Sequence, residues 1–185
     1  MAHLLWVAHR AEAVRLAHVQ AHILGIKFGT RFPRRKKGRT LSEQDDDVTA
    51  LEPLSKRRLQ GSLARNEWNY FIDDQGDIGS AWDVGRIYYM LIGDDRQILF
   101  MPGYFEGEYP AGLALDLLRF CNEWEAHNAM PKAYIQERDG KVFLRGDWML
   151  GLKGGITDVQ LDEVVRSATL SVMKFFEAAQ ERFGN

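Results

Sequence analysis

Four stretches rich in aromatic and β-branched residues follow one another so closely that only tight turns can connect them. They lie at residues 68–72, 78–82, 87–92 and 97–101. The turn-forming sequences between them are Asp73-Asp74-Gln75-Gly76-Asp77, Gly85 and Gly93-Asp94-Asp95. Parallel strands need a crossover of about a dozen or more residues. The spacing therefore predicts an antiparallel meander of four strands.

Helical patterns stand before and after this meander. Residues 53–65 suit a short helix, and residues 110–127 carry apolar side chains at helical spacing. A third pattern starts at the capping box Thr157-Asp-Val-Gln160, in which the first and last side chains bond to each other's backbone N–H groups. A long amphipathic helix is expected from that point onward.

Two further strands are expected as a hairpin at residues 133–137 and 141–148. Asp139-Gly140 lies between them and supplies the positive φ angles that a tight turn requires. The resulting order is helix, four strands, helix, two strands, helix. Runs of strands with segregated helices are typical of an α+β fold. The sequence thus predicts an antiparallel β-sheet of five to six strands with the helices packed on one face.

Charge divides the chain into two parts of opposite sign. Residues 1–40 contain nine Lys or Arg and one acidic residue, whereas the remaining residues hold fifteen basic and twenty-five acidic ones. Residues 1–24 are helix-like, and residues 30–47 form a linker with a basic block followed by an acidic one. We therefore expect an N-terminal extension at residues 1–47 and the domain proper at residues 48–185.

The cysteine and histidine content argues against a metal site. The single cysteine, Cys121, excludes an intramolecular disulfide and any multi-cysteine site. His18 and His22 stand at the spacing that zinc favours, but no third ligand accompanies them. No apolar run approaches the about 20 residues of a membrane helix, and no clean signal peptide opens the chain. The cytoplasm is the expected compartment.

No set of residues in the sequence predicts a catalytic centre. Asp73, Asp74 and Asp77 fit turn chemistry better than a Ca²⁺ loop, which needs alternating ligands and a distal Glu. Glu123 and His127 have the spacing of a general acid–base pair, but ion pairing on a helix surface is the simpler explanation of the same spacing. Neither a phosphate-binding glycine loop nor an activated nucleophile is evident. We expect a non-enzymatic protein without a cofactor.

Four short motifs of the predicted domain match one known family in their order and spacing. They are Asp74-Gln-Gly-Asp-Ile78, Phe120-Cys-Asn-Glu-Trp124, Pro131-Lys-Ala-Tyr134 and Gly154-Gly-Ile-Thr-Asp158. On these motifs the chain from about Pro53 to Phe183 resembles the YbjN family, which is named for a bacterial sensory-transduction regulator and whose members are mostly of unknown activity. The family often has Asn-x-Trp-Asn in the middle helix, where this chain has Glu125 in the last place.

The resemblance carries expectations about fold and role. It implies an α+β fold similar to that of type III secretion chaperones, which are small, acidic and often dimeric proteins that bind other polypeptides. Likeness of fold alone does not assign a function. Residues 1–48 lie outside the resemblance.

The leading hypothesis is a non-enzymatic, chaperone-like or adaptor module that binds a protein partner and forms a homodimer. The body of the chain is acidic, and its aromatic residues exceed what one small core readily hides, which is typical of an interface. The candidate partner-binding residues are Asn122, Trp124, Trp82, Tyr88 and Trp148.

The alternative hypothesis rests on the basic segment at residues 31–39, which places six cations in nine positions. Its residues Arg34, Arg35, Lys36 and Lys37 can contact nucleic acid or an anionic membrane. The protein would then be a regulator that acts through a basic arm. A solvated linker accounts for the same charges, and a small ligand on the sheet is a third option.

Overall fold

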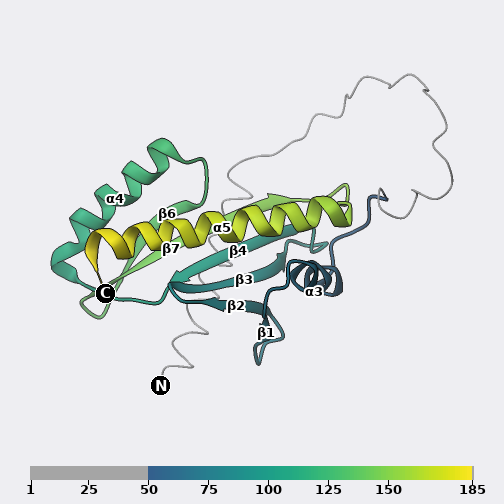
Figure 1. Cartoon of the computed structure of the whole chain (residues 1–185), viewed down its shortest axis with the longest axis horizontal. Helices are drawn as coiled ribbons and strands as arrows, with labels where there is room; N and C mark the ends of the chain where they lie inside the picture. The colour runs from purple at the N-terminus through teal and green to yellow at the C-terminus, as the bar shows by residue number, and fades with distance from the viewer. Residues whose placement is uncertain (1–49, 185) are drawn as a thin grey trace. The chain divides into compact units, whose positions relative to one another are not determined.

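The structure of the chain, a computed structural model, describes residues 50–184 (Figure 1). Within these residues the elements follow in an order close to the predicted one. They are α3 (Lys56–Arg65), β1 (Phe71–Ile72), β2 (Ile78–Trp82), β3 (Gly85–Ile92), β4 (Ile98–Phe105), β5 (Tyr109–Pro110), the 3₁₀ turn η1 (Ala111–Leu113), α4 (Ala114–His127), β6 (Lys132–Arg138), β7 (Lys141–Gly151) and α5 (Asp158–Phe183).

The strands form one antiparallel sheet of seven members. Strands β1 to β4 follow as a meander, β7 pairs with β4, and β6 pairs with the other edge of β7. The two-residue strand β5 pairs with Val142 and Lys141 of β7, beyond the stretch of β7 that pairs with β4. The α+β fold class, the antiparallel sheet and the helices on one face are thereby confirmed, and only β5 has no counterpart in the sequence prediction.

Helix α5 lies across one face of the sheet (Figure 1). Its buried residues form much of the core and are Leu161, Val165, Ala168, Thr169, Val172, Met173, Phe175, Phe176 and Ala179. Two glycines of the sheet, Gly103 and Gly85, allow α5 to pack closely against the strands. A Cβ at Gly103 would stand 2.4 Å from Cγ1 of Val172, and one at Gly85 would stand 2.9 Å from the ring of Phe176. Close approach of α5 therefore requires the smallest residue at both strand positions.

Side-chain caps define where two helices begin. Oγ1 of Thr157 accepts the N–H of Gln160 at 3.2 Å, and Oε1 of Gln160 accepts the N–H of Thr157 at 3.2 Å. This is the predicted capping box, and α5 starts directly after it. Helix α3 starts at Lys56, slightly later than predicted, because Oγ of Ser55 accepts the N–H of Arg58 at 3.3 Å.

Turn chemistry explains one confirmed hairpin and one shortened strand. Asp139-Gly140 has φ angles of 51° and 73°, so the hairpin between β6 and β7 has the predicted turn.

The predicted strand at residues 68–72 is reduced to the two residues of β1. Glu67 has a φ of 60°, and Trp68 then packs its ring edge-on against Trp82 with centroids 5.1 Å apart. The ring contact takes this residue out of the strand pairing.

The predicted N-terminal extension, with its basic residues 34–37 and the histidines at positions 18 and 22, lies outside the described residues. Near the first described residues, an isolated antiparallel bridge joins Glu52 to Ile156. The two residues exchange backbone hydrogen bonds of 3.3 and 3.0 Å. Residues 50–184 contain no helix that combines the length and apolar character of a membrane span.

Candidate partner-binding face

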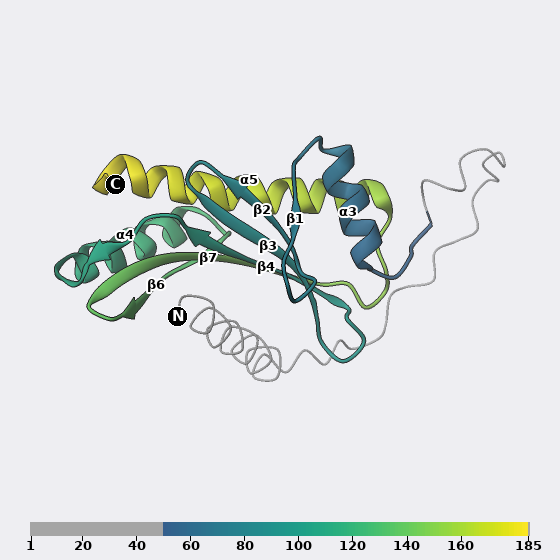
Figure 2. The same ribbon diagram turned by 90° about the horizontal axis from the view of Figure 1, so that it is seen from below.

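One face of the sheet carries no helix among residues 50–184. Successive residues of a strand point to opposite faces, and Tyr89 faces α5, where its hydroxyl lies 3.1 Å from Oγ1 of Thr169. Its neighbour Tyr88 therefore points to the other side, which we call the helix-free face. Figure 2 shows α5 passing behind strands β2, β3 and β4.

Aromatic rings form a continuous band across the helix-free face. The ring of Phe71 on β1 meets Tyr88 on β3 edge to face, with centroids 5.7 Å apart. Tyr88 meets Tyr104 on β4 in the same way at 5.8 Å. Arg145 on β7 places its guanidinium 4.6 Å from the centroid of Tyr104. We call these four side chains the aromatic band, which crosses the sheet from its β1 edge to β7.

The guanidinium of Arg145 is held in place from several sides. Its Nε donates to Oε1 of Gln136 at 3.3 Å, and its Nη1 donates to the carbonyl of Leu144 at 3.2 Å. The ring of Phe143 lies 5.6 Å away on its strand. Burial lowers the pKa of Arg145, but a guanidinium stays charged in proteins. The band thus ends in a fixed cation stacked on an aromatic ring, an arrangement that is attractive by itself.

A carboxylate next to the band has one oxygen without a hydrogen bond. Oδ2 of Asp147 accepts from the hydroxyl of Tyr134 at 3.1 Å. Oδ1 is inaccessible to solvent and has no hydrogen-bond partner among the described residues. Burial raises the pKa of Asp147 to about 6, and it also raises the pKa of Tyr134. Burial of Oδ1 of Asp147 without a hydrogen bond therefore costs free energy of folding.

The structure places the five sequence-predicted residues on different surfaces. Tyr88 belongs to the aromatic band. Trp82 and Trp148 pack partly buried against the core on the side of the sheet that α5 covers. Trp124 of α4 is partly buried, with its ring centroid 5.3 Å from that of Phe175, while Asn122 is exposed on the same helix. These five residues do not form one site.

Most of the aromatic band was missed by sequence reasoning. Phe71, Tyr104 and Arg145 come from three different strands, and no spacing in the sequence brings them together. Alternation along each strand was the available signal, but it identifies a shared face only once the pairing register is known. The register sets Phe71 opposite Gly79 and Tyr104 opposite Arg145.

The other candidate groups have structural partners. The carboxylate of Glu123 pairs with Arg182 of α5, and Nδ1 of His127 lies 2.9 Å from the backbone carbonyl of Glu123. Oδ1 of Asp73 accepts the N–H groups of Gln75 and Asp77 at 3.0 and 2.8 Å, as the predicted turn requires. Within residues 50–184 no cluster of three His, Cys, Asp or Glu side chains is placed to hold a metal ion.

Glu125 has a clear structural role at the position where the family resemblance would place Asn. Its Oε1 accepts the backbone N–H of Ala133 at 2.9 Å. This bond joins the end of α4 to the start of β6, the edge strand of the sheet. A carboxylate thus satisfies an N–H group on an edge strand.

The sheet, the three helices on one face and the aromatic band on the other define a small α+β domain. The chain belongs to the YbjN family: the family model described as "Putative bacterial sensory transduction regulator" matches residues 55–181. The resemblance stated from the four sequence motifs is thereby confirmed. No curated protein matches the chain.

Solved structures similar to the chain include the following two. The crystal structure of YbjN from E. coli, titled a "putative transcription regulator", is 18% identical, with a TM-score of 0.60 over 72% of this chain and 97% of that one. A chain of the HopA1–SchA chaperone–effector complex is 14% identical, with a TM-score of 0.46 over 70% of this chain and 99% of that one. At 18% identity, the similarity to the YbjN structure shows a shared fold and nothing further.

Proposed function

We propose that the domain is a non-enzymatic regulatory module that binds a protein partner through the aromatic band. The observation that carries this proposal is the guanidinium of Arg145, which is fixed 4.6 Å from the ring of Tyr104 on a face without a described helix. Tyr and Arg are the residues most enriched among those that dominate protein interfaces. Their rigidity also lowers the entropy lost on binding.

The composition of the helix-free face favours a polypeptide over a small ligand. Phe71 is 36% exposed and Tyr104 and Arg145 are partly exposed, as are the neighbouring Phe143 and Tyr134, whereas Tyr88 in the middle of the band is buried. These side chains lie along several strands instead of converging on one cavity, as a small-molecule site would require. The family's regulatory description agrees with a role exerted through binding.

Site-specific photocrosslinking in bacterial cells tests the proposal. A photoreactive amino acid at Phe71 should capture one polypeptide, whereas the same group at Leu115, exposed on α4, should not capture it. The captured protein, once purified, is then titrated against the wild type and the variant Arg145→Lys. This variant keeps the charge but loses the planar guanidinium, so affinity should fall by about tenfold or more.

Arg119→Lys on α4 is the matched control, because this arginine is exposed and lies away from the band. It should leave affinity unchanged. Equal capture from positions 71 and 115, or an Arg145→Lys variant that binds as tightly as the wild type, would reject the aromatic band as the binding site. Retained stability of each variant is checked by urea unfolding.

The basic segment at residues 31–39 supports a second candidate function. Six cations in nine residues, within a stretch (residues 1–40) that holds nine basic residues and one acidic one, favour contact with nucleic acid or an anionic membrane. Binding to DNA, RNA or anionic vesicles should then be lost on deletion of residues 1–47 and weaken steeply with salt. Binding that survives both changes would remove this candidate and leave residues 1–47 as an extension without that role.

A further inference from the structure

A cavity of about 390 Å³ lies where three segments of the chain meet beside the start of β4. Its walls come from the stretch before α3 (residues 51–54), the turn between β3 and β4 (residues 95–97) and the loop between β7 and α5 (residues 152–155). We call it the loop cavity. Its volume falls within the range of small-molecule sites, which is about 300–1,000 Å³.

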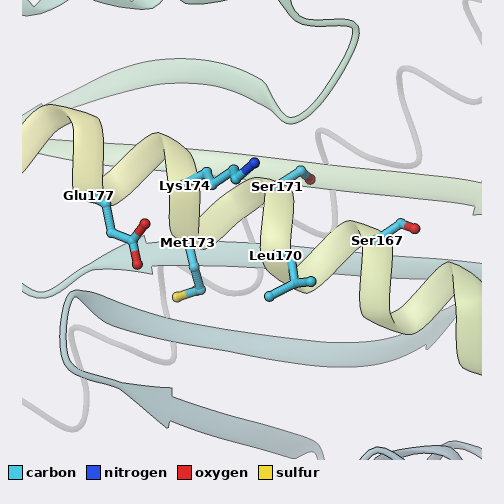
Figure 3. Close-up of a pocket in the computed structure, with 6 residues that line it drawn as sticks. All are labelled: Ser167, Leu170, Ser171, Met173, Lys174 and Glu177. Atoms are coloured by element: carbon cyan, nitrogen blue, oxygen red, sulfur yellow. The ribbon is translucent and has the colours of Figure 1, made fainter.

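A second cavity, of about 420 Å³, runs along α5. The six side chains labelled in Figure 3, from Ser167 to Glu177, all belong to that helix. One element supplies the whole lining, so a ligand there would be contacted from a single side. The loop cavity surrounds a ligand with three segments instead, which makes it the stronger candidate for a binding site.

Backbone hydrogen bonds hold the walls of the loop cavity together. The N–H of Leu152 donates to the carbonyl of Gln97 at 2.6 Å, which joins two of the three segments. The bridge between Glu52 and Ile156 attaches the third segment, and Arg58 donates to the carbonyl of each of these two residues at 2.7 Å. The cavity is therefore preformed, as small-molecule sites usually are.

Leucine side chains give the loop cavity an apolar part. Leu54 is buried, Leu152 is half-buried and Leu51 is 63% exposed. This is the largest exposed fraction among the large apolar side chains of residues 50–184. An apolar ligand that covered Leu51 would remove its side chain from water, which is favourable.

Two cations line the loop cavity from different segments. Arg96 lies in the β3–β4 turn and Lys153 in the β7–α5 loop, and both are exposed. Neither side chain forms an ion pair or a hydrogen bond with any residue from 50 to 184. Asp95 is the acidic residue of the lining, so two cations against one carboxylate leave a net charge of +1. The charge of the cavity thus favours an anionic ligand.

The backbone of Arg96 indicates that its side chain has a role outside folding. Its φ is 51°, in the left-handed region that glycine adopts most easily. Its N–H donates to the carbonyl of Gly93 at 3.0 Å and closes the turn, a bond that glycine would form equally. The turn therefore does not account for an arginine here, and uncommon backbone conformations of this kind cluster at functional sites.

We propose that the loop cavity binds a small amphipathic carboxylate. The apolar body of the ligand covers Leu51 and Leu152, and its carboxylate lies between Arg96 and Lys153. Arginine suits this position because its planar guanidinium can donate two parallel hydrogen bonds to a carboxylate. The loop cavity contains none of the four side chains of the aromatic band. The inference therefore does not rest on the proposed partner function, and either can fail alone.

Nuclear magnetic resonance of the isotope-labelled full chain tests the proposal with three probes. Octanoate, kept below the concentration at which it forms micelles, carries both the apolar body and the carboxylate, whereas octanol lacks the charge and acetate lacks the apolar body. Octanoate should shift the backbone amide signals of residues 95–97 and 152–155 in a saturable manner. Octanol and acetate should each bind at least about tenfold more weakly, because each makes only part of the contacts.

Two variants separate the binding role of the cations from the stability of the fold. Arg96→Gly removes the guanidinium but suits the positive φ, so the urea midpoint should stay the same or rise while octanoate affinity falls by about threefold or more. Lys153→Gln should weaken octanoate to a similar extent without altering the turn. Arg57→Gln removes an exposed cation of α3 outside the loop cavity and should leave the affinity unchanged.

Three results would overturn the proposal. The first is octanoate that shifts no signals of the three cavity segments. The second is octanol that binds as tightly as octanoate, which would show that the cations take no part. The third is wild-type affinity for octanoate in both Arg96→Gly and Lys153→Gln.

Discussion

The hydroxyl of Tyr89 on β3 lies 3.1 Å from Oγ1 of Thr169 on α5, eighty positions later in the chain. A second contact of 2.9 Å joins the same hydroxyl to Oγ of Ser80 on β2. All three residues are buried, so the three hydroxyl groups satisfy one another inside the core. Burial raises the pKa of Tyr89, which keeps its hydroxyl protonated.

Removing this hydroxyl should destabilise the fold although the ring remains. Tyr89→Phe leaves the hydroxyls of Ser80 and Thr169 short of a partner, so the free energy of unfolding should fall by about 1–3 kcal/mol. Urea unfolding measures it. Tyr70→Phe is the control, because Tyr70 is 40% exposed and its change should stay within about 0.5 kcal/mol. Equal effects of the two variants would show that the buried contacts contribute nothing.

Gly103 should tolerate no side chain. In Gly103→Ala the added Cβ would stand 2.4 Å from Val172 and 2.8 Å from the carbonyl of Gly146. The helix or the strand must move, and the free energy of unfolding should fall by about 1–3 kcal/mol. Gly151→Ala, at an open position of β7, should change it by less than about 0.5 kcal/mol in a thermal melt. A melt of Gly103→Ala that matches the wild type would contradict this packing.

Asp147 should make the fold less stable as pH rises. Its pKa is about 6 in the folded chain and lies near its ordinary value of 3.8 in the unfolded chain, because burial disfavours the carboxylate. Between these values the folded state binds more protons, so the penalty grows as pH rises through the window and is complete above it. The change in free energy of unfolding that Asp147→Asn causes, relative to the wild type, should therefore be more favourable at pH 8 than at pH 4. Urea unfolding at both pH values measures this difference. The same difference at both pH values would rule out this titration.

Cys121 should be unreactive in the folded protein. Burial raises the pKa of its thiol to about 12, with a further contribution from the charge of Glu125. At pH 8 the thiolate is then only about one part in ten thousand of the population, and the thiolate is the nucleophile. A thiol reagent should modify Asn122→Cys, at the exposed neighbouring position, rapidly while leaving Cys121 unmodified until urea is added. Prompt modification of both thiols would contradict the burial of Cys121.

Arg58 should stabilise the fold through hydrogen bonds that lysine cannot replace. Its guanidinium donates to Oδ1 of Asp158 at 2.7 and 2.9 Å, and to the carbonyls of Glu52 and Ile156 at 2.7 Å each. Lysine cannot reach these acceptors at once, so Arg58→Lys should lower the free energy of unfolding by about 1–2 kcal/mol. Arg57→Lys, at an exposed neighbouring position, is the matched control and should be neutral in the same urea titration.

Local signals in the sequence account for most of the elements. The Thr157–Gln160 capping box and the Asp139-Gly140 turn act within a few residues, so they can be recognised without knowing the fold. Strand β5 could not be predicted, because Tyr109 and Pro110 pair with Val142 and Lys141 of β7, which lie more than thirty positions later in the chain. Its two residues have no periodicity to detect.

The candidate site was less predictable because it depends on register. Tyr88 and Trp82 are both aromatic strand residues, yet they lie on opposite faces of the sheet. The stacking of Arg145 on Tyr104 requires β4 to pair with β7 across the whole of α4, and nothing in either strand specifies that partner. Aromatic content thus predicts an interface, whereas the gathering of Phe71, Tyr88 and Tyr104 on one face is seen only in the three-dimensional arrangement.

The position of α5 in the chain has a consequence for how the protein is made. A ribosome that has synthesised the chain only as far as Gly155 has made every strand but not the helix that covers them. Until Val172 and Phe176 emerge, the sheet surface around Gly103 and Gly85 has no cover, and contacts such as Arg58 to Asp158 span a hundred residues. Long-range contacts of this kind slow folding. The nascent chain is therefore an expected client of cellular holdases, and its native core can close only after translation has passed α5.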